Sequence, residues 1–168
     1  MNLLVIVNGP AGSGKDTFVQ LCREWLSTLY ACTSANVHSS KTAKQALRLL
    51  GWQGEKTPET RKLLVDLTDF GHAHSISEYL IDQENHSRVV FFHERDPIQI
   101  AKLKEAYRHS ISLFVQWPEK AALEPDIWCM ADYEYDYHTI TDGDLEEFNK
   151  KARMFVMDVI KPLVYGKE

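Results

Sequence analysis

A short glycine-rich stretch near the start of the chain has the composition and spacing of a loop that binds phosphate groups. It reads Gly9-Pro10-Ala11-Gly12-Ser13-Gly14-Lys15, which gives the spacing G-x-x-x-x-G-K between an apolar run and an amphipathic one. Glycines let the backbone curl so that successive N–H groups face a phosphate, and the following helix start adds positive potential. We therefore expect a nucleoside triphosphate to bind Gly9, Ala11, Gly12, Ser13, Gly14 and Lys15. The alternative is an ordinary glycine-rich turn with an exposed lysine.

The residues after Lys15 depart from the usual pattern of such a loop. A serine or threonine normally follows the lysine and gives its hydroxyl to Mg²⁺, whereas here Asp16 follows and Thr17 comes one position later. Carboxylate oxygens are good ligands for Mg²⁺. We therefore predict that Asp16 and Thr17 hold the Mg²⁺ ion, and that Lys15 and Asp16 act in catalysis. In the alternative interpretation, Asp16 only complements the helix dipole and Thr17 alone serves the metal.

Basic residues further along the chain could bind an anionic acceptor. At about 100° per residue, Lys41, Lys44 and Arg48 fall within about 60° of one another on one helix, opposite an apolar face that ends at Leu50. Arg95 follows an expected strand, at the edge of an α/β sheet where ligands bind, and is also a catalytic candidate. The acceptor candidates are therefore Lys41, Lys44, Arg48, Arg61 and Arg95. The alternative for the helical ones is a solvated charged face.

The elements that must position these side chains alternate between strand and helix, which predicts a parallel sheet. Strands are expected at residues 3–7, 30–38, 88–92, 111–115 and 133–141. Helices are expected from about residues 15, 40, 58, 97 and 145. Thr57 and Asp96 are expected helix caps, with Gln99 completing a capping box. The residues expected to point inward from the third helix are Leu63, Leu64, Leu67 and Phe70.

The loop also carries a family resemblance. Gly12-Ser13-Gly14-Lys15-Asp16-Thr17 is similar to the loop of phage deoxynucleoside monophosphate kinases, within the P-loop nucleoside monophosphate kinase group. An S-G-K-D loop also occurs in animal-type phosphomevalonate kinases. Looser similarity extends through Ser39-Ser40-Lys41, Gly51-Trp52-Gln53-Gly54-Glu55-Lys56, Arg61-Lys62-Leu63-Leu64, Arg95-Asp96-Pro97, Tyr135-Asp136-Tyr137 and Asp142-Gly143-Asp144-Leu145.

The resemblance implies an α/β P-loop NTPase fold formed by one domain, with five parallel strands and helices on both faces. It implies a helical substrate region at residues 39–86, in which Ser40 joins the acceptor candidates, and a short lid at 117–131. It also implies phosphoryl transfer from ATP, with Mg²⁺, to a nucleoside or deoxynucleoside monophosphate. The alternatives are a phosphomevalonate-like kinase and a regulatory protein that binds a nucleotide without turnover.

The expected lid contains Lys120 but no arginine between residues 117 and 130, whereas adenylate-kinase-like lids commonly supply arginines. Charge stabilisation is therefore expected from Lys15, Mg²⁺ and Arg95, with Arg108 and Lys120 as further candidates.

Composition limits the partners and the location. A chain of 168 residues with 44% hydrophobic and 26% charged residues is typical of a globular protein, which excludes disorder. The net charge of −5 argues against nucleic acid as a partner. No apolar run approaches the roughly 18 residues that span a bilayer, and three cysteines without a C-x-x-C pair fit a reducing cytoplasm. We expect no membrane partner, and a homo-oligomer stays open.

The seven histidines do not predict a metal site, because the spacing of His72-Ala73-His74 places the two rings on different sides of a helix.

Overall fold

The computed structural model describes residues 1–55, 57–121 and 133–166, which build a central sheet of five parallel strands. The strands are β1 (Leu3–Asn8), β2 (Ser34–His38), β3 (Val89–His93), β4 (Ser110–Gln116) and β5 (Tyr137–Ile140). Their order is β2-β3-β1-β4-β5, so β1 is central, with Val5 opposite Phe91 of β3 and Ile111 of β4. Because the strands are parallel, their carboxyl ends meet at one edge, which we call the carboxyl edge.

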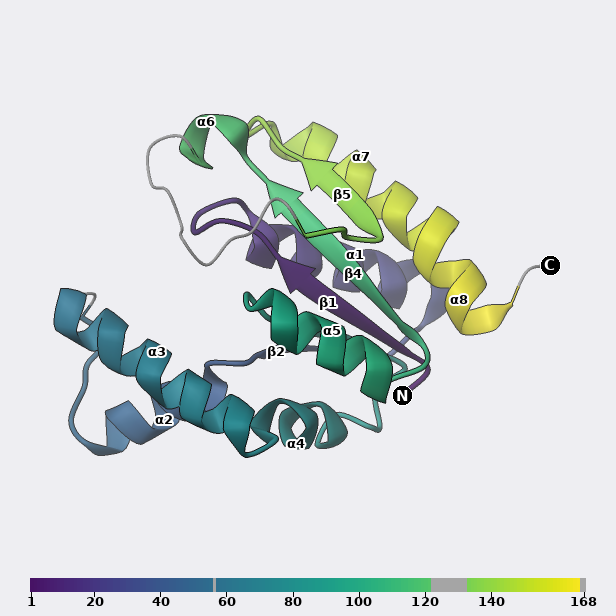
Figure 1. The fold of residues 1–168 in the computed structure, drawn as a ribbon. Coiled ribbons are helices and arrows are strands. Elements are labelled where there is room, and N and C mark those ends of the chain that lie inside the picture. The colour runs from purple at the N-terminus through teal and green to yellow at the C-terminus, as the bar shows by residue number, and fades with distance from the viewer. Residues whose placement is uncertain (56, 122–132, 167–168) are drawn as a thin grey trace.

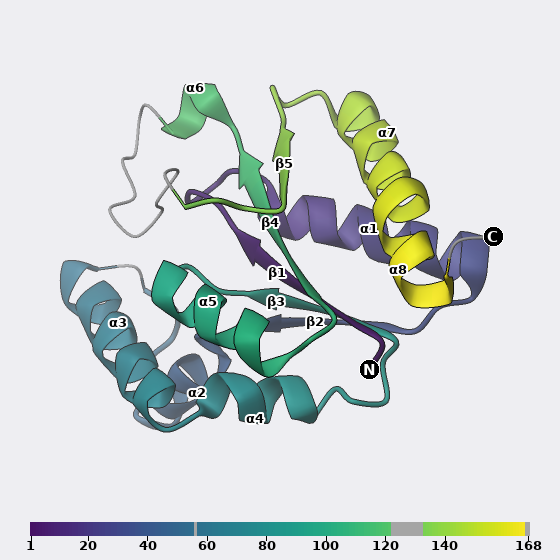
Figure 2. The same ribbon diagram turned by 45° about the vertical axis from the view of Figure 1, so that its right-hand side comes forward.

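Helices cover both faces of this sheet (Figures 1 and 2). On one face α1 (Lys15–Tyr30) packs with α7 (Leu145–Phe155) and with the π-helical turn η1 (Val156–Ile160), which continues into α8 (Lys161–Tyr165). On the other face lie α4 (Ile76–Asp82) and α5 (Pro97–Ala106). Two more helices, α2 (Lys41–Leu49) and α3 (Pro58–Ala73), connect β2 to α4, and the short α6 (Pro118–Ala121) follows β4.

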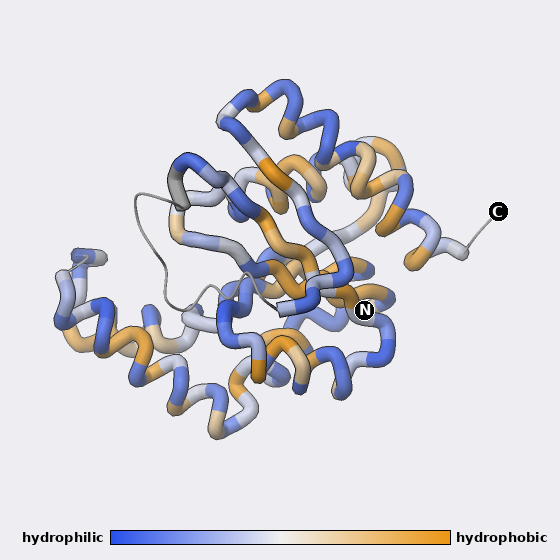
Figure 3. Tube along the Cα trace, turned by 45° about the horizontal axis from the view of Figure 1, so that its top comes forward, coloured by the Kyte–Doolittle hydropathy of each residue, from blue (hydrophilic) through white to orange (hydrophobic). Residues whose placement is uncertain are grey.

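The apolar run of β1 is continuous because both of its faces are buried. Leu3, Val5 and Val7 pack in the core beneath α1 and α7, while Leu4 and Ile6 pack in the core beneath α4 and α5. Figure 3 shows the same pattern, with hydrophobic residues concentrated along the central strands. The predicted fold class, a five-stranded parallel sheet with helices on both faces, is confirmed.

Two expected strands are longer than the observed ones. Helix α1 runs to Tyr30 and ends at Ala31, whose backbone is left-handed with φ 46°, so β2 begins only at Ser34. Strand β5 begins at Tyr137 rather than at residue 133. Of the expected lid at 117–131, α6 covers Pro118–Ala121, and residues 122–131 lie outside the described residues.

The inward direction expected for the apolar residues of α3 is partly wrong. Leu64 and Leu67 are half-buried, but Leu63 is 43% exposed and Phe70 is 65% exposed. Leu50, which directly follows α2, was expected on the apolar face of that helix and is 82% exposed. Leu63 and Phe70 are exposed because α3 packs mainly on α2 and α4 rather than on the sheet, so the buried face of α3 is narrow.

The expected caps are confirmed at Thr57 and Asp96. Thr57 forms a reciprocal capping box with Thr60, and the Asp96 carboxylate accepts a hydrogen bond from the N–H of Ile98. The box expected at Gln99 is wrong, because the N–H of Asp96 donates to Glu94 instead. Ser40 occupies the cap position of α2 without a hydrogen bond from its side chain.

Cys22 and Cys32 are buried free thiols, and Cys129 lies outside the described residues. Among the described helices, none combines the length and apolar character needed to cross a bilayer.

Candidate phosphate-binding site

The glycine-rich loop connects the carboxyl end of β1 to the first turn of α1, and its backbone requires glycine. Gly9 has φ 147° and lies so close to β4 that an added Cβ would be 2.1 Å from the carbonyl oxygen of Val115. Gly14 has φ 84° at the position that caps α1. A side chain at either position would strain the backbone or displace it. The loop is therefore shaped around its glycines, as a backbone phosphate cradle needs.

Two polar side chains of the loop point to its function. The ammonium group of Lys15 donates hydrogen bonds to the carbonyl oxygens of Gly9 (2.7 Å) and Pro10 (2.5 Å), which folds the lysine back over the loop. The hydroxyl of Ser13 is buried and makes no hydrogen bond within the described part of the chain. An unpartnered buried hydroxyl beside curled glycines fits a loop that receives phosphate oxygens.

Asp16 lies in the first turn of α1 and points toward the ends of β2 and β3. Its Oδ1 atom is 3.3 Å from Nε2 of His38 and 3.9 Å from Nε2 of His93. The hydrogen bond from His38 lowers the pKa of the Asp16 carboxyl to about 2, although partial burial acts in the opposite direction. The positive charge of Lys15 also lowers it. Asp16 is therefore a carboxylate throughout the physiological pH range, as a metal ligand must be.

His38 and His93 end β2 and β3 and are direct neighbours in the register of these strands. Their rings are stacked, with centroids 4.1 Å apart and planes inclined by 14°. The side chain of His93 is only 6% exposed, and neither of its ring nitrogens has a hydrogen-bond partner within the described residues. Burial lowers the pKa of His93 to about 3, and the charges of Lys15 and Lys44 act in the same direction. His93 is therefore uncharged at neutral pH.

Glu94 organises the turn that carries Arg95. Its Oε1 atom accepts hydrogen bonds from the N–H groups of Arg95 (2.8 Å) and Asp96 (3.1 Å), and its side chain is 2% exposed. Its Oε2 atom is 2.9 Å from Nε2 of His72 on α3. Burial opposes the charged form of His72, but the hydrogen bond and the charge of Glu94 outweigh it and raise the pKa of His72. This pair joins the helical segment to the end of β3.

Asn8, the last residue of β1, connects three parts of the carboxyl edge. Its amide nitrogen donates to the carbonyl oxygen of Arg95 (3.0 Å) and to the hydroxyl of Tyr135 (2.7 Å). Its amide oxygen accepts from the N–H of Gly9 (2.7 Å). One buried side chain thus holds the phosphate-binding loop, the Arg95 turn and the segment before β5 in fixed relative positions.

This arrangement of sheet, loop and helices is shared with solved structures of other proteins. The chain is similar to the thymidylate kinase of Ehrlichia chaffeensis with a TM-score of 0.52 and 13% identity, over 95% of this chain and 98% of that chain. It is similar to the APS kinase CysC of Mycobacterium tuberculosis with a TM-score of 0.51 and 12% identity, over 95% and 96%. The chain has the P-loop kinase fold. No protein-family model and no curated protein matches its sequence.

The predicted site residues of this P-loop fold are only partly brought together. Asp16 lies against the histidine pair, and the positive charges of Lys15 and Lys44 lower the pKa of His93. Arg95 is exposed and directly follows β3 at the carboxyl edge. The exposed guanidinium groups of Arg48 and Arg61 make no hydrogen bond or ion pair within the described part of the chain. The other predicted residues at the surface of this region are Thr17 and Lys41, both exposed, and Ser40, which is half-buried.

Arg108 and Lys120 were the further candidates for charge stabilisation. Arg108 precedes β4 and so lies at the opposite edge of the sheet from the loop, which makes that expectation wrong. Lys120 lies in α6, which follows the carboxyl end of β4.

Sequence reasoning missed the polar residues that end the strands. Asn8, His38 and His93 are the last residues of β1, β2 and β3, and Glu94 follows at once. A signal was present, because a polar residue directly after a buried apolar strand often lies where α/β proteins bind ligands. Which histidines meet, however, depends on the strand order.

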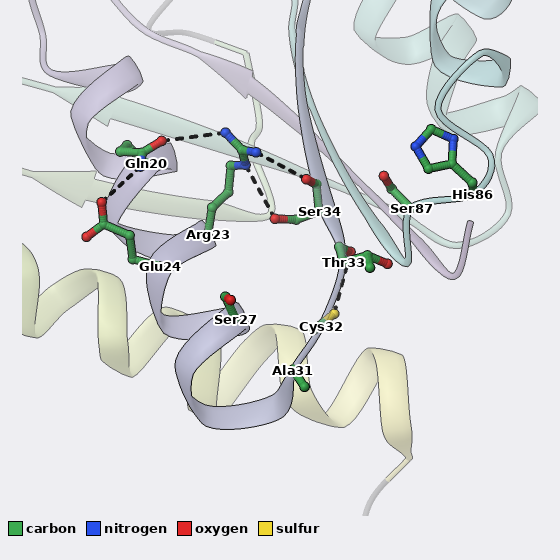
Figure 4. Close-up of a pocket in the computed structure, with 10 residues that line it drawn as sticks. All are labelled: Gln20, Arg23, Glu24, Ser27, Ala31, Cys32, Thr33, Ser34, His86 and Ser87. Carbon is green, nitrogen blue, oxygen red and sulfur yellow. Dashed lines mark hydrogen bonds between the residues drawn. The ribbon is translucent and has the colours of Figure 1, made fainter.

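A separate groove of about 690 Å³ lies away from this site (Figure 4). It is lined by the carboxyl-terminal part of α1 and by the segments that enter β2 and β3. These segments meet at the amino ends of the parallel strands, so the groove lies at the edge opposite the phosphate-binding loop.

Proposed function

We propose that this protein is an ATP- and Mg²⁺-dependent kinase that phosphorylates a nucleoside or deoxynucleoside monophosphate. The observation that carries the proposal is the loop from Gly9 to Lys15, set between the central strand and α1, with a backbone that requires glycine and a lysine folded over it. The P-loop kinase fold supports a phosphotransferase. The likeness to a thymidylate kinase favours a nucleotide acceptor.

The chain supplies groups for each task of phosphoryl transfer. Lys15 and the backbone N–H groups of the loop would hold the phosphates of ATP, and Asp16 and Thr17 would hold Mg²⁺, which neutralises phosphate charge when bound. An oxygen of the acceptor phosphate then attacks the terminal phosphorus of ATP. The bond from that phosphorus to its bridging oxygen breaks, and ADP leaves with the electron pair. Lys15 and Arg95 would stabilise the charge that develops.

The acceptor would bind between α2, α3 and the end of β3, in the region of residues 39–86 and Arg95. The basic face of α2 carries Lys41, Lys44 and Arg48, and Arg61 lies in the first turn of α3. Because the described part of the chain gives Arg48 and Arg61 no acidic partner, both guanidinium groups are available for a phosphate. We also propose that residues 1–168 form one domain and that 117–131 form its lid.

The test is a coupled assay of ADP release with Mg²⁺–ATP and a panel of nucleoside monophosphates, deoxynucleoside monophosphates and phosphomevalonate. We expect turnover with at least one nucleoside or deoxynucleoside monophosphate, at a rate well above acceptor-free ATP hydrolysis. The Lys15→Ala variant should show background release with every acceptor.

A second candidate is favoured by the S-G-K-D sequence of the loop, which phosphomevalonate kinases share. Turnover with phosphomevalonate alone would establish it in place of the first. If ATP binds and no acceptor raises ADP release, the proposed catalytic function is wrong and a regulatory nucleotide-binding role remains.

A further inference from the structure

Three metal-ligand side chains from three separate elements meet beside the phosphate-binding loop. Asp16 begins α1, His38 ends β2 and His93 ends β3. One ligand atom from each, a carboxylate oxygen and two imidazole nitrogens, lies within 4.8 Å of the other two. These residues are 22 to 77 positions apart in the sequence, so the fold itself brings them together.

The buried histidine provides an independent reason to look for a ligand. The side chain of His93 is only 6% exposed, yet neither of its ring nitrogens has a hydrogen-bond partner among the described residues. A buried polar group normally has a partner, because leaving it without one is costly. Nε2 of this ring is 3.9 Å from Oδ1 of Asp16, and the ring stacks on that of His38, so an unpartnered nitrogen lies beside both of the other candidate ligands.

We propose that Asp16, His38 and His93 form a binding site for a divalent transition-metal ion of the Zn²⁺ type. Two imidazoles and one carboxylate are a donor set that Zn²⁺ and its neighbours accept readily, whereas Mg²⁺ prefers oxygen ligands alone. Three protein ligands leave a fourth position of a tetrahedral ion open to water or to another oxygen ligand. The site goes beyond the proposed kinase function but shares the Asp16 carboxylate with its Mg²⁺ site, so Zn²⁺ binding is tested without nucleotide.

The surrounding charges give the site little electrostatic attraction for a cation. Asp16 supplies one negative charge, but Lys15 and Lys44 lie close enough to act on His93. Their positive charge opposes any cation, so affinity must come from the nitrogen lone pairs rather than from attraction between charges. Selectivity for Zn²⁺ over Mg²⁺ comes from the two imidazole donors, because Zn²⁺ binds nitrogen readily and Mg²⁺ prefers oxygen.

Binding requires a small movement of His38. A coordinated imidazole holds the metal in its own ring plane, and two nearly parallel rings 4.1 Å apart cannot both contain one ion. His93 is held by burial, whereas the side chain of His38 is 38% exposed. His38 therefore turns out of the stack to complete the site, and metal binding replaces its hydrogen bond to Asp16.

The experiment is titration calorimetry of the full-length, tag-free, metal-stripped protein with ZnCl₂ and separately with MgCl₂, without nucleotide. We expect one Zn²⁺ per chain and no competition from a hundredfold excess of Mg²⁺. His38→Ala should weaken Zn²⁺ binding at least tenfold, because it removes one nitrogen ligand. His109→Ala, an exposed histidine at the opposite edge of the sheet, is the matched control and should bind as the wild type does.

A second pair of measurements covers the buried ligand. His93→Gln keeps a polar side chain of similar size, and circular dichroism will show whether it folds; the folded variant should lose Zn²⁺ binding as His38→Ala does. Co²⁺ bound to the wild type should give a visible absorption band that His38→Ala removes. Equal Zn²⁺ affinity in wild type and His38→Ala, no Zn²⁺ bound at one per chain, or displacement by Mg²⁺ would overturn the proposal.

Discussion

Lys15 is the residue whose removal should affect catalysis most and stability least. Its ammonium group donates to two carbonyl oxygens of the phosphate-binding loop, so Lys15→Ala removes charge from the phosphates and little apolar packing. We expect kcat for ADP release to fall by roughly 10² to 10³, the usual loss when one charge-stabilising donor is removed. The unfolding temperature should change little.

Lys102→Ala, which removes an exposed lysine from α5, is the control for a general loss of positive charge. Wild-type turnover in Lys15→Ala would contradict the assignment of the loop to phosphate binding.

Asp16 should act through Mg²⁺ in the proposed reaction. Asp16→Asn keeps the shape of the side chain and removes its charge, so the Mg²⁺ concentration at half-maximal turnover should rise severalfold and kcat should fall. Asp16→Ser should recover part of the activity, because a hydroxyl is the usual ligand at this position. The measurement is turnover against Mg²⁺ concentration for all three proteins. Coincident Mg²⁺ curves would mean that Asp16 only complements the helix dipole, and that Thr17 serves the metal.

The sequence was sufficient to predict the loop residues but not the histidine pair. The loop is local, because Gly9, Gly14 and Lys15 act through spacing along one stretch of backbone. His38 and His93 meet only because β2 and β3 are adjacent and in register, although 50 residues of helix and loop separate these strands. Spacing along the sequence does not show which strands are adjacent in the sheet. The spacing of the histidines therefore did not predict a site.

At the scale of elements, the contact between His72 and Glu94 attaches α3 to the end of β3. The pKa of His72 is raised in the folded protein, so this contact stabilises fully below the unfolded histidine pKa of about 6.5. The stabilisation is lost as the pH rises through the higher folded pKa. We expect His72→Gln to lower the unfolding temperature most near pH 6, with the difference from wild type shrinking toward pH 9.

His74→Gln changes an exposed histidine at the end of the same helix and is the matched control. A difference between wild type and His72→Gln that stays constant from pH 6 to pH 9 would show that His72 acts only through packing.

The basic residues of the helical segment and of the β3 turn should act on the acceptor rather than on ATP. Arg48→Ala and Arg95→Ala each remove a guanidinium group suited to bidentate contact with a phosphate. We expect the KM for the acceptor to rise or kcat to fall in each, while ATP binding in the absence of acceptor stays near wild type. Acceptor titrations at saturating ATP provide the measurement. Unchanged kcat and KM in both variants would leave the basic face of α2 as an ordinary solvated surface.

Strands and helices could be predicted from the sequence where their apolar residues are fully buried, and less well where burial is partial. The strand β1 is apolar without interruption because helices cover both of its faces, and its prediction was one residue short of the observed strand. Helix α3 was predicted to begin after Thr57, which is correct, but Phe70 was expected inside and lies outside. A helix that packs on other helices rather than on the sheet buries a narrow stripe, and the apolar pattern alone does not show which part of it is covered.

At the scale of the whole molecule, the residues of the site lie at strand ends that are held by hydrogen bonds between several elements. Asn8 ties the loop to the Arg95 turn and to Tyr135, Glu94 ties that turn to α3, and the sheet beneath them is buried on both faces. Ligand binding at this edge therefore engages most of the fold. A ligand that binds the folded chain and not the unfolded chain stabilises the entire cooperative unit.

This coupling predicts that Mg²⁺ and a non-hydrolysable ATP analogue raise the unfolding temperature of the whole chain. At a ligand concentration one hundred times its Kd, the expected stabilisation is about 2.7 kcal/mol. For a domain of this size that corresponds to a rise of roughly 5 to 11 °C. Lys15→Ala should lose most of the rise, because weaker phosphate contacts raise the Kd, whereas Lys102→Ala should keep it. Scanning calorimetry at several analogue concentrations measures the effect. An unfolding temperature that does not depend on analogue concentration, or that rises equally in Lys15→Ala, would show that the loop does not bind the triphosphate.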